Sequence, residues 1–289
     1  MIRTFLLLIL TTVLSIVGTI TLLPRLDFKP STTALSKPAE PAFSRIMKTG
    51  TIRCGYGIAE PWLYIDPNSK KVMGLGADVI EAVAEKLALK IDWAEETGWE
   101  HIGVALKNGR IDVGCSSLWI LGNRAREMLF TDAYVYNPLY LYAHENETRF
   151  HTMEDINQPQ TRVSVLDGDV SVLLKERYFP HATSVALSAL STPADIFINL
   201  TAKKTDVAIT DPITVATFNQ TNEIKLKRLF ETPLVAFGAG YPIAKGEYSL
   251  KFMLDNALNE LKMSGELVEI IKKYTAKYPN SLLPPKNEY

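Results

Sequence analysis

Residues 51–115 decide the fold, because strand-like and helix-like segments alternate there in the order TIRCGY (51–56), GLGADVIEAVAEKLAL (74–89), IDW (91–93), IGVALK (102–107) and IDVGC (111–115). The short apolar segments predict strands. Between Ala77 and Leu89 apolar residues recur at intervals of three and four, which predicts an amphipathic helix. The second helix is predicted to end at Asn108-Gly109, because glycine often follows the last helical turn. The alternation predicts a parallel sheet with helices on both faces.

A second unit with the same alternation follows. Strands are predicted at 162–166, 183–187 and 206–210, and helices at 170–178 and 193–201. A last strand at 241–244 precedes helices at 250–264 and 267–274, and the side chains expected to face inward from the first of these are Phe252, Met253, Leu254, Ala257, Leu258 and Leu261. Because this last segment can return to the first unit, we expect two lobes joined by two crossings. Ligands of such sheets bind at the carboxyl ends of the strands, which predicts a cleft that closes on a small molecule.

The N-terminus predicts export. Residues 5–23 carry no charge and consist mainly of Leu, Ile, Val and Thr. Residues 1–24 can therefore be an uncleaved membrane anchor, which needs about 20 apolar residues, or a cleaved signal peptide, and both alternatives stay open. Residues 25–42 contain Pro30, Pro38 and Pro41 and are predicted to form an extended linker. The rest of the chain is expected in the periplasm, secreted, or tethered to the outer face of the cytoplasmic membrane.

Charge and cysteine content exclude several classes of protein. The formal net charge is -1 and like charges do not cluster, so nucleic acid is not an expected partner. Two cysteines are too few for a cysteine-rich metal site, and the four histidines lack the spacing of metal ligands. We expect no metal and no cofactor. An exported compartment permits a disulfide between Cys54 and Cys115, but two buried thiols are an equally open alternative.

Further stretches add a family resemblance. They are Pro61-Trp62, Gly74 to Ile80, Trp99 to Leu106, Asn108 to Asp112, Ser116 to Arg124 with Phe130-Thr131, Thr205 to Asp211, Tyr241 to Gly246 and Ile271 to Tyr274. In this order and spacing, over roughly residues 44–276, the chain resembles the periplasmic (extracellular) solute-binding proteins of family 3, which serve polar amino-acid ABC transporters.

The resemblance implies a fold and a function. The fold is α/β, two-lobed and periplasmic-binding-protein-like (type II), and each lobe is a mostly parallel sheet flanked by helices. Lobe 1 is expected to comprise residues 43–140 plus 237–289, and lobe 2 residues 141–236. The implied function is to close the lobes around a small amino-acid-like carboxylate and to deliver it to an ABC-transporter permease. An enzyme is not expected, and no catalytic residue is assigned.

The resemblance also implies ligand-binding residues. Arg124 stands where the family places the arginine for the ligand carboxylate, and a guanidinium suits that group because its planar fork donates two parallel hydrogen bonds. Asp211 matches the acidic position that would accept from the ligand ammonium, and Ser117 supplies a hydroxyl at the end of a first-lobe strand. Trp99 matches an aromatic position that stacks on the ligand, and Trp62 is expected to wall the cleft.

Departures from the family pattern concentrate in the first lobe. Trp119 stands two residues after Ser117, where the family has a small hydroxyl residue, so it would fill space or stack on a cation. Trp119 and Tyr56 are therefore added to the expected ligand-binding residues. The other departures are Gly76 at an acid position, Leu121-Gly122-Asn123 in place of a Thr–acid pair, Tyr56 at an acid position and Ala59 at an aromatic position. Together they predict a bulkier and less polar first-lobe half of the cleft.

Two other functions fit the same fold. A membrane-tethered solute sensor would pass its signal to a membrane partner instead of a permease, and the apolar N-terminus with its linker allows this. A cyclohexadienyl-dehydratase-like enzyme would need a general acid in the cleft, for which Glu60 and Asp169 are candidates by position.

Overall fold

The computed structural model describes residues 40–98, 101–188 and 191–286. The segment predicted for export and all but the last three residues of the predicted linker lie outside these ranges, and so does Trp99. Helix α2 (Ala42–Thr49) begins at the last residue of that linker. Within the described residues, none of the helices combines the length and the apolar character needed to cross a membrane.

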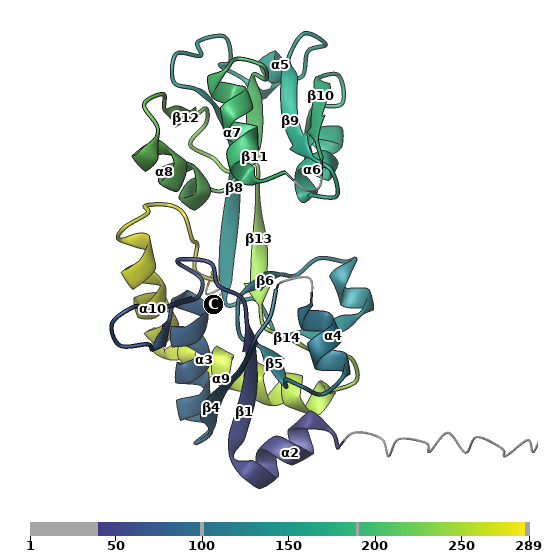
Figure 1. The fold of residues 1–289 in the computed structure, drawn as a ribbon, viewed down its shortest axis with the longest axis vertical. Helices are drawn as coiled ribbons and strands as arrows, with labels where there is room; N and C mark the ends of the chain where they lie inside the picture. The colour runs from purple at the N-terminus through teal and green to yellow at the C-terminus, as the bar shows by residue number, and fades with distance from the viewer. Residues whose placement is uncertain (1–39, 99–100, 189–190, 287–289) are drawn as a thin grey trace, which may run out of the picture. The chain divides into compact units, whose positions relative to one another are not determined.

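Lobe 1 is built on a five-stranded sheet with the order β4-β1-β5-β14-β7 (Figure 1). β1 (Thr51–Tyr56) pairs in parallel with β4 (Lys90–Glu96) and with β5 (Val113–Gly114). β14 (Pro242–Ala244) comes from the C-terminal part of the chain and lies antiparallel between β5 and β7 (Met128–Phe130). The last segment of the chain therefore returns to the first unit, as the sequence predicts.

Helices cover both faces of this sheet. α3 (Leu75–Lys86), α9 (Tyr248–Ser264) and α10 (Glu266–Thr275) pack on one another over one hydrophobic core, and α4 (Ile102–Lys107) contributes to a second core. A small two-stranded sheet, β2 (Tyr64–Ile65) with β3 (Val72–Met73), precedes α3.

Lobe 2 repeats this arrangement on a second sheet. β9 (Arg162–Leu166), β10 (Thr183–Leu187) and β11 (Val207–Thr210) are parallel, and β11 and β12 (Leu226–Arg228) pair antiparallel with β8 (Val135–His144). Successive side chains of β11 alternate between the two faces of the sheet: Val207 and Ile209 face one core, and Ala208 faces the other. The helices are α5 (Met153–Ile156), α6 (Val170–Tyr178), α7 (Pro193–Thr201) and α8 (Pro212–Thr221).

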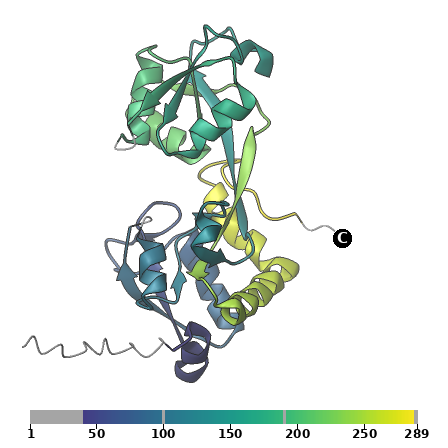
Figure 2. The ribbon, with the colours of Figure 1, turned by 90° about the vertical axis from the view of Figure 1, so that its right-hand side faces the viewer.

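Two long strands connect the lobes. β8 and β13 (Val235–Gly240) are antiparallel and run together from one lobe to the other (Figures 1 and 2). Val135 and Ala239 belong to the lobe 1 core, whereas Leu139 belongs to a lobe 2 core. β6 (Leu118–Trp119) pairs with the lobe 1 end of β13. The predicted lobe boundaries at residues 140/141 and 236/237 fall within these two strands.

The structure joins the two cysteines in a disulfide. Cys54 lies on β1 and Cys115 follows β5, the neighbouring strand, with their Cα atoms 5.4 Å apart. Both residues are fully buried in the lobe 1 core. Of the two alternatives that the sequence leaves open, this structure has the disulfide.

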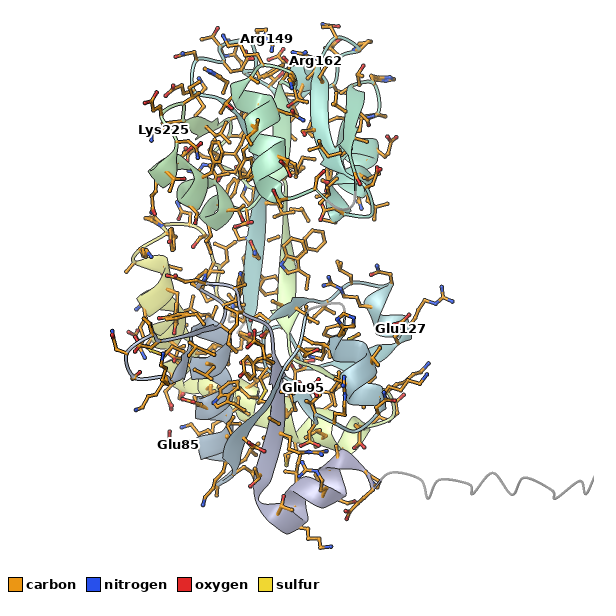
Figure 3. The ribbon with its side chains drawn as sticks, in the orientation of Figure 1. Glu85, Glu95, Glu127, Arg149, Arg162 and Lys225 are labelled. Atoms are coloured by element: carbon orange, nitrogen blue, oxygen red, sulfur yellow. A yellow bond between two sulfur atoms is a disulfide. The ribbon has the colours of Figure 1, made fainter. Side chains whose placement is uncertain are left out.

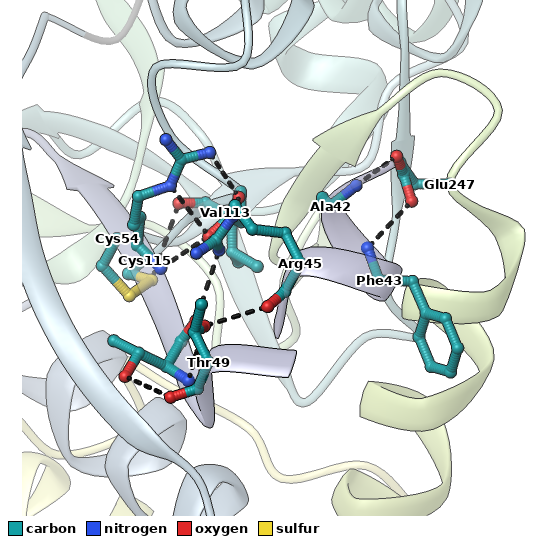
Figure 4. Close-up of polar contacts among 11 residues, drawn as sticks. Ala42, Phe43, Arg45, Thr49, Cys54, Val113, Cys115 and Glu247 are labelled. Atoms are coloured by element: carbon teal, nitrogen blue, oxygen red, sulfur yellow. Dashed lines mark hydrogen bonds and ion pairs between the residues drawn. A yellow bond between two sulfur atoms is a disulfide. The ribbon is translucent and has the colours of Figure 1, made fainter. Parts of the chain in front are cut away.

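Each lobe also contains a buried aspartate with two arginines. Asp112, just before β5, accepts from the backbone N–H of Arg53 at 2.7 Å and forms ion pairs with Arg53 and Arg45 of α2. The same α2 is fixed at its start by Glu247, whose carboxylate accepts from the backbone N–H groups of Ala42 and Phe43 (Figure 4). These contacts hold the first described helix on lobe 1.

Asp206, at the start of β11 in lobe 2, has the equivalent contacts. It accepts from the backbone N–H of Arg162 at 2.8 Å and pairs with Arg162 and Arg149, which lie together at the far end of lobe 2 (Figure 3). In both lobes the aspartate therefore fixes the start of its own strand to the neighbouring parallel strand, on the edge opposite to the ligand-binding edge expected for such sheets.

One predicted core position is wrong. Phe252 of α9 is 71% exposed, and the buried stripe consists of Leu250, Leu254, Ala257, Leu258 and Leu261. A helix presents only residues three and four apart on one face, and Phe252 lies outside that spacing.

Candidate functional site

A small cavity collects residues from both lobes. Its volume is about 210 Å³, and its lining residues are Trp62, Ser117, Leu118, Trp119, Arg124, Asn137, Asp211 and Ala239. Ser117 follows the carboxyl end of β5, and Asp211 follows the carboxyl end of β11. These are the edges at which ligands bind in α/β sheets. The cavity is therefore the candidate site.

A larger cavity of about 850 Å³ lies beside α4 and shares only Arg124 with the candidate site. Its lining includes Lys107, Glu127 and Lys245, and all of its residues belong to lobe 1. None of the described lobe 2 residues lines it, whereas the smaller cavity has lining residues from both lobes.

Arg124 offers unpaired hydrogen-bond donors to the candidate site. It opens a short 3-10 helix, Arg124–Arg126, and its backbone N–H donates to the Asn123 side chain at 2.9 Å. One guanidinium N–H donates to the Trp119 carbonyl at 3.1 Å. In the described part of the chain, no carboxylate lies within ion-pair distance of it, Glu127 included. As far as the described residues go, most of its N–H donors are left for an anion.

Arg124 is positively charged at neutral pH. Partial burial lowers the pKa of Arg124, and the negative charge of Asp169 in lobe 2 opposes that shift. A guanidinium nevertheless remains protonated at neutral pH, because its ordinary pKa lies so far above 7.

Asp211 is the negative group of the cavity and also caps a helix. It is the N-cap of α8, and Pro212 occupies the first helical position. One carboxylate oxygen accepts from the backbone N–H groups of Ile213 and Thr214, each at 3.0 Å. The other accepts from the Thr214 hydroxyl at 2.5 Å. Because a carboxylate has about four acceptor positions, these contacts leave one for a ligand.

Ser117 is held by two buried tyrosines. Its hydroxyl forms a hydrogen bond with that of Tyr134, whose ring stacks on Tyr241 with 4.6 Å between centroids. The Tyr241 hydroxyl donates to the Gly76 carbonyl at 2.7 Å. Burial raises the pKa of Tyr134 to about 12, so the phenol is neutral at physiological pH. The Ser117 hydroxyl is thus fixed at the edge of the cavity by a neutral chain that ends on helix α3.

Aromatic side chains form the apolar wall. The ring of Trp119 stacks on Phe237 of β13 with 5.3 Å between centroids. The Trp62 carbonyl accepts from the Gly76 N–H at 2.8 Å, so the first turn of α3 positions this loop. Gly76 fits only because it lacks a side chain: a Cβ there would lie 2.8 Å from the Cys115 carbonyl oxygen and 3.4 Å from the Ser117 hydroxyl.

The structure brings most of the predicted site residues together. Trp62, Ser117, Trp119, Arg124 and Asp211 all line the cavity. The prediction for Trp99 falls outside the described residues.

Tyr56 is not brought to this cavity. Its ring packs edge-on against Trp93 of β4, with 5.7 Å between centroids.

Three residues that the sequence did not indicate also line the cavity: Asn137 from β8, Leu118 from β6 and Ala239 from β13. Asn137 precedes a proline, and an Asn-Pro pair is usually a turn signal. The long apolar run around it was the available evidence for a strand. Over the described residues, no cluster of three or more His, Cys, Asp or Glu side chains could hold a metal ion.

Comparison with known proteins identifies the family. Residues 52–277 match the model of the bacterial extracellular solute-binding proteins, family 3, and the chain belongs to this family. The resemblance predicted from the sequence is confirmed. Members of this family are extracellular solute-binding proteins, and the curated relatives that the chain matches are named as amino-acid-binding proteins.

Individual relatives support the same assignment. The chain is 26% identical over 238 residues to the L-cystine-binding protein TcyA of Bacillus subtilis, covering 80% of this chain and 84% of that protein. It is 23% identical to the L-arginine-binding protein of Pseudomonas aeruginosa, covering 77% and 87%. Among solved structures, it is similar to the probable amino-acid ABC transporter extracellular-binding protein ytmK of Bacillus subtilis, with a TM-score of 0.66, 21% identity and coverage of 78% and 97%. This likeness confirms the two-lobed α/β fold.

Proposed function

We propose that this protein binds one zwitterionic α-amino acid between its lobes and delivers it to an ABC transporter. Arg124 binds the ligand carboxylate, Asp211 and Ser117 bind the ammonium, and Trp62 and Trp119 cover the side chain. The observation that carries the proposal is that Arg124 and Asp211, with opposite charges and from different lobes, line one small cavity without an ion-pair partner among the described residues. The two charges match the two charges of an amino acid.

Closure follows from the connections between the lobes. We propose that residues 43–140 and 237–289 move as one lobe and residues 141–236 as the other, with β8 and β13 as the hinge. A ligand that bridges Arg124 and Asp211 makes its full set of contacts only when both residues reach it. It therefore stabilises the closed arrangement by its differential affinity.

A thermal-shift screen tests the binding. The full-length chain, purified in mild detergent, is heated with each proteinogenic amino acid and with L-cystine. A ligand at about 100 times its Kd adds about 2.7 kcal/mol of stability, which corresponds to a rise in Tm of about 5–10 °C for a domain of this size.

Two arginine variants identify the carboxylate contact. Arg124→Ala should weaken binding of the hit by at least about 50-fold, because a charged hydrogen-bonding partner is lost in a partly buried site. Arg126→Ala is the matched control, since Arg126 lies in the same short helix but does not line the cavity, and it should bind normally. Equal loss in both variants, or no loss in Arg124→Ala, would refute the assignment.

Delivery needs a separate measurement. Deletion of the gene should reduce uptake of the radiolabelled hit, and expression of the wild-type chain should restore uptake while the Arg124→Ala chain does not. Unchanged uptake after deletion would separate ligand binding from transport and point to the sensor function instead.

A further inference from the structure

A buried amide in the hinge strand has no partner. Asn137 lies on β8 and is only 3% exposed. Its Oδ1 atom is buried and has no hydrogen-bond partner among the described residues. Leaving a buried acceptor unpaired costs free energy, so such atoms are rare in folded proteins. Asn137 therefore needs an explanation.

Asn137 faces the candidate site. It is the direct cross-strand neighbour of Phe237 on β13, and directly opposed residues of antiparallel strands share a face. Phe237 stacks on Trp119, and both Trp119 and Asn137 line the cavity with Arg124 and Asp211. The unpaired amide thus belongs to the wall of the proposed binding site, on the strand that joins the two lobes.

The chemistry of the ligand ammonium supplies the missing partner. An ammonium has three N–H donors. Asp211 has one acceptor position left after its three contacts at the start of α8, and Ser117 can offer one more. A third acceptor is needed, and an amide oxygen is suitable because it adds no charge to a cavity already balanced by one arginine and one aspartate.

We propose that Asn137 is a ligand-binding residue whose Oδ1 accepts a hydrogen bond from the ammonium group of the amino acid. This inference rests on the proposed function and adds a residue that determines specificity for a primary ammonium. Rotation about χ2, a torsion with broad minima, turns Oδ1 from its buried position toward the ligand. Because Asn137 lies on the hinge strand, the contact also links occupation of the site to the conformation of β8.

Two substitutions at this position separate recognition from packing. Asn137→Leu keeps the approximate shape and removes both polar ends, so the ligand-free Tm should stay the same or rise while affinity for the screening hit falls at least tenfold. Asn137→Asp keeps an acceptor oxygen at the same place and adds a negative charge that attracts the ligand ammonium, so its affinity should not fall more than about threefold below the wild type. Affinities are measured by isothermal titration with the full-length chain in detergent.

Ser164→Ala is the matched control. Ser164 of β9 is 1% exposed and also has a buried hydroxyl without a partner, but it does not line the cavity. Its substitution should leave affinity unchanged.

Asn137→Leu with affinity within twofold of the wild type would overturn the proposal, because the amide would then serve packing or bind a water molecule. Asn137→Asp with a tenfold loss would also overturn it, and this arm remains informative if the Leu variant does not fold. Failure of the proposed function looks different: no amino acid or L-cystine then stabilises even the wild-type chain.

Discussion

The disulfide between Cys54 and Cys115 is expected to be a main source of the stability of lobe 1. The perturbation is the double substitution Cys54→Ala with Cys115→Ala. The bond joins residues 61 positions apart, and closing a loop of that length in the unfolded chain is worth about 4 kcal/mol in the chain-entropy treatment. For a domain of this size, that loss should lower Tm by about 10 °C.

The assay is thermal unfolding followed by circular dichroism, with and without a reductant. The wild type should lose about 10 °C when reduced, because reduction removes the same cross-link without changing any other side chain. The double variant should already unfold at the lower temperature and should not respond to the reductant. Thiol titration of denatured, unreduced wild type should find no free thiol. Two free thiols, or a Tm in the double variant within about 2 °C of the wild type, would refute the reasoning.

Three further predictions concern single positions. Asp112→Ala should lower the free energy of unfolding by about 3–5 kcal/mol in urea titrations, because two arginines lose their fully buried partner. An unchanged urea midpoint would show that water replaces the carboxylate. Gly76→Ala should lower Tm by several degrees, because its Cβ would lie 2.8 Å from the Cys115 carbonyl oxygen. This clash should outweigh the helix propensity of alanine, which is about 1 kcal/mol better than that of glycine. A higher Tm would show that the backbone around Cys115 moves away and removes the clash. Burial alone would raise the pKa of Asp206, but hydrogen bonds from arginines such as Arg162 lower it below its ordinary value of 3.8. The stabilisation by ionised Asp206 is therefore complete above about pH 4 and is lost as pH falls further. Asp206→Asn removes this titration, so the Tm of the variant should decline less steeply below pH 4 than the Tm of the wild type. An equally steep decline would contradict this.

Elements with local start and stop signals were predictable to the residue. α6 begins after Asp169, whose side chain accepts from the Ser171 N–H at 2.8 Å, and α7 begins with Pro193, so both helices lie where the sequence places them. The strands beside them, 162–166 and 183–187, also match. Local capping chemistry determines these boundaries, and local chemistry is what a single sequence displays.

Elements that depend on distant partners were not predictable. β8 continues through Pro138 because β13, about a hundred residues later in the chain, pairs with it across the hinge. α8 is an exception among the elements with local signals: Asp211 and Pro212 form a helix start, but the sequence prediction uses them as the end of a strand and a ligand position and contains no helix there. Asp211 is both an N-cap and a cavity residue. The exposed position of Phe252 likewise depends on which face of α9 meets α3 and α10.

The candidate site shows the same division. The charged pair was predictable, since Arg124 and Asp211 follow from the family pattern and from the chemistry of an amino acid. Tyr56 was expected near the ligand, but its ring packs on Trp93, which depends on the register between β1 and β4. Asn137 reaches the cavity only through the register of β8 with β13. Tyr56, which lies outside the cavity, and Asn137, which lines it without having been predicted, are therefore both placed by long-range strand pairing.

Isothermal titration with three matched ligands tests the central claim most directly. The wild-type chain is titrated with the amino acid found by the screen, with its methyl ester, which lacks the carboxylate charge, and with its α-hydroxy acid, which lacks the ammonium. If Arg124 and Asp211 bind the two ends of one zwitterion, the amino acid should bind with one site per chain, and each analogue should bind at least about 50-fold more weakly. An analogue that binds as tightly as the amino acid would contradict the account, because the charge it lacks would then have no partner in the site.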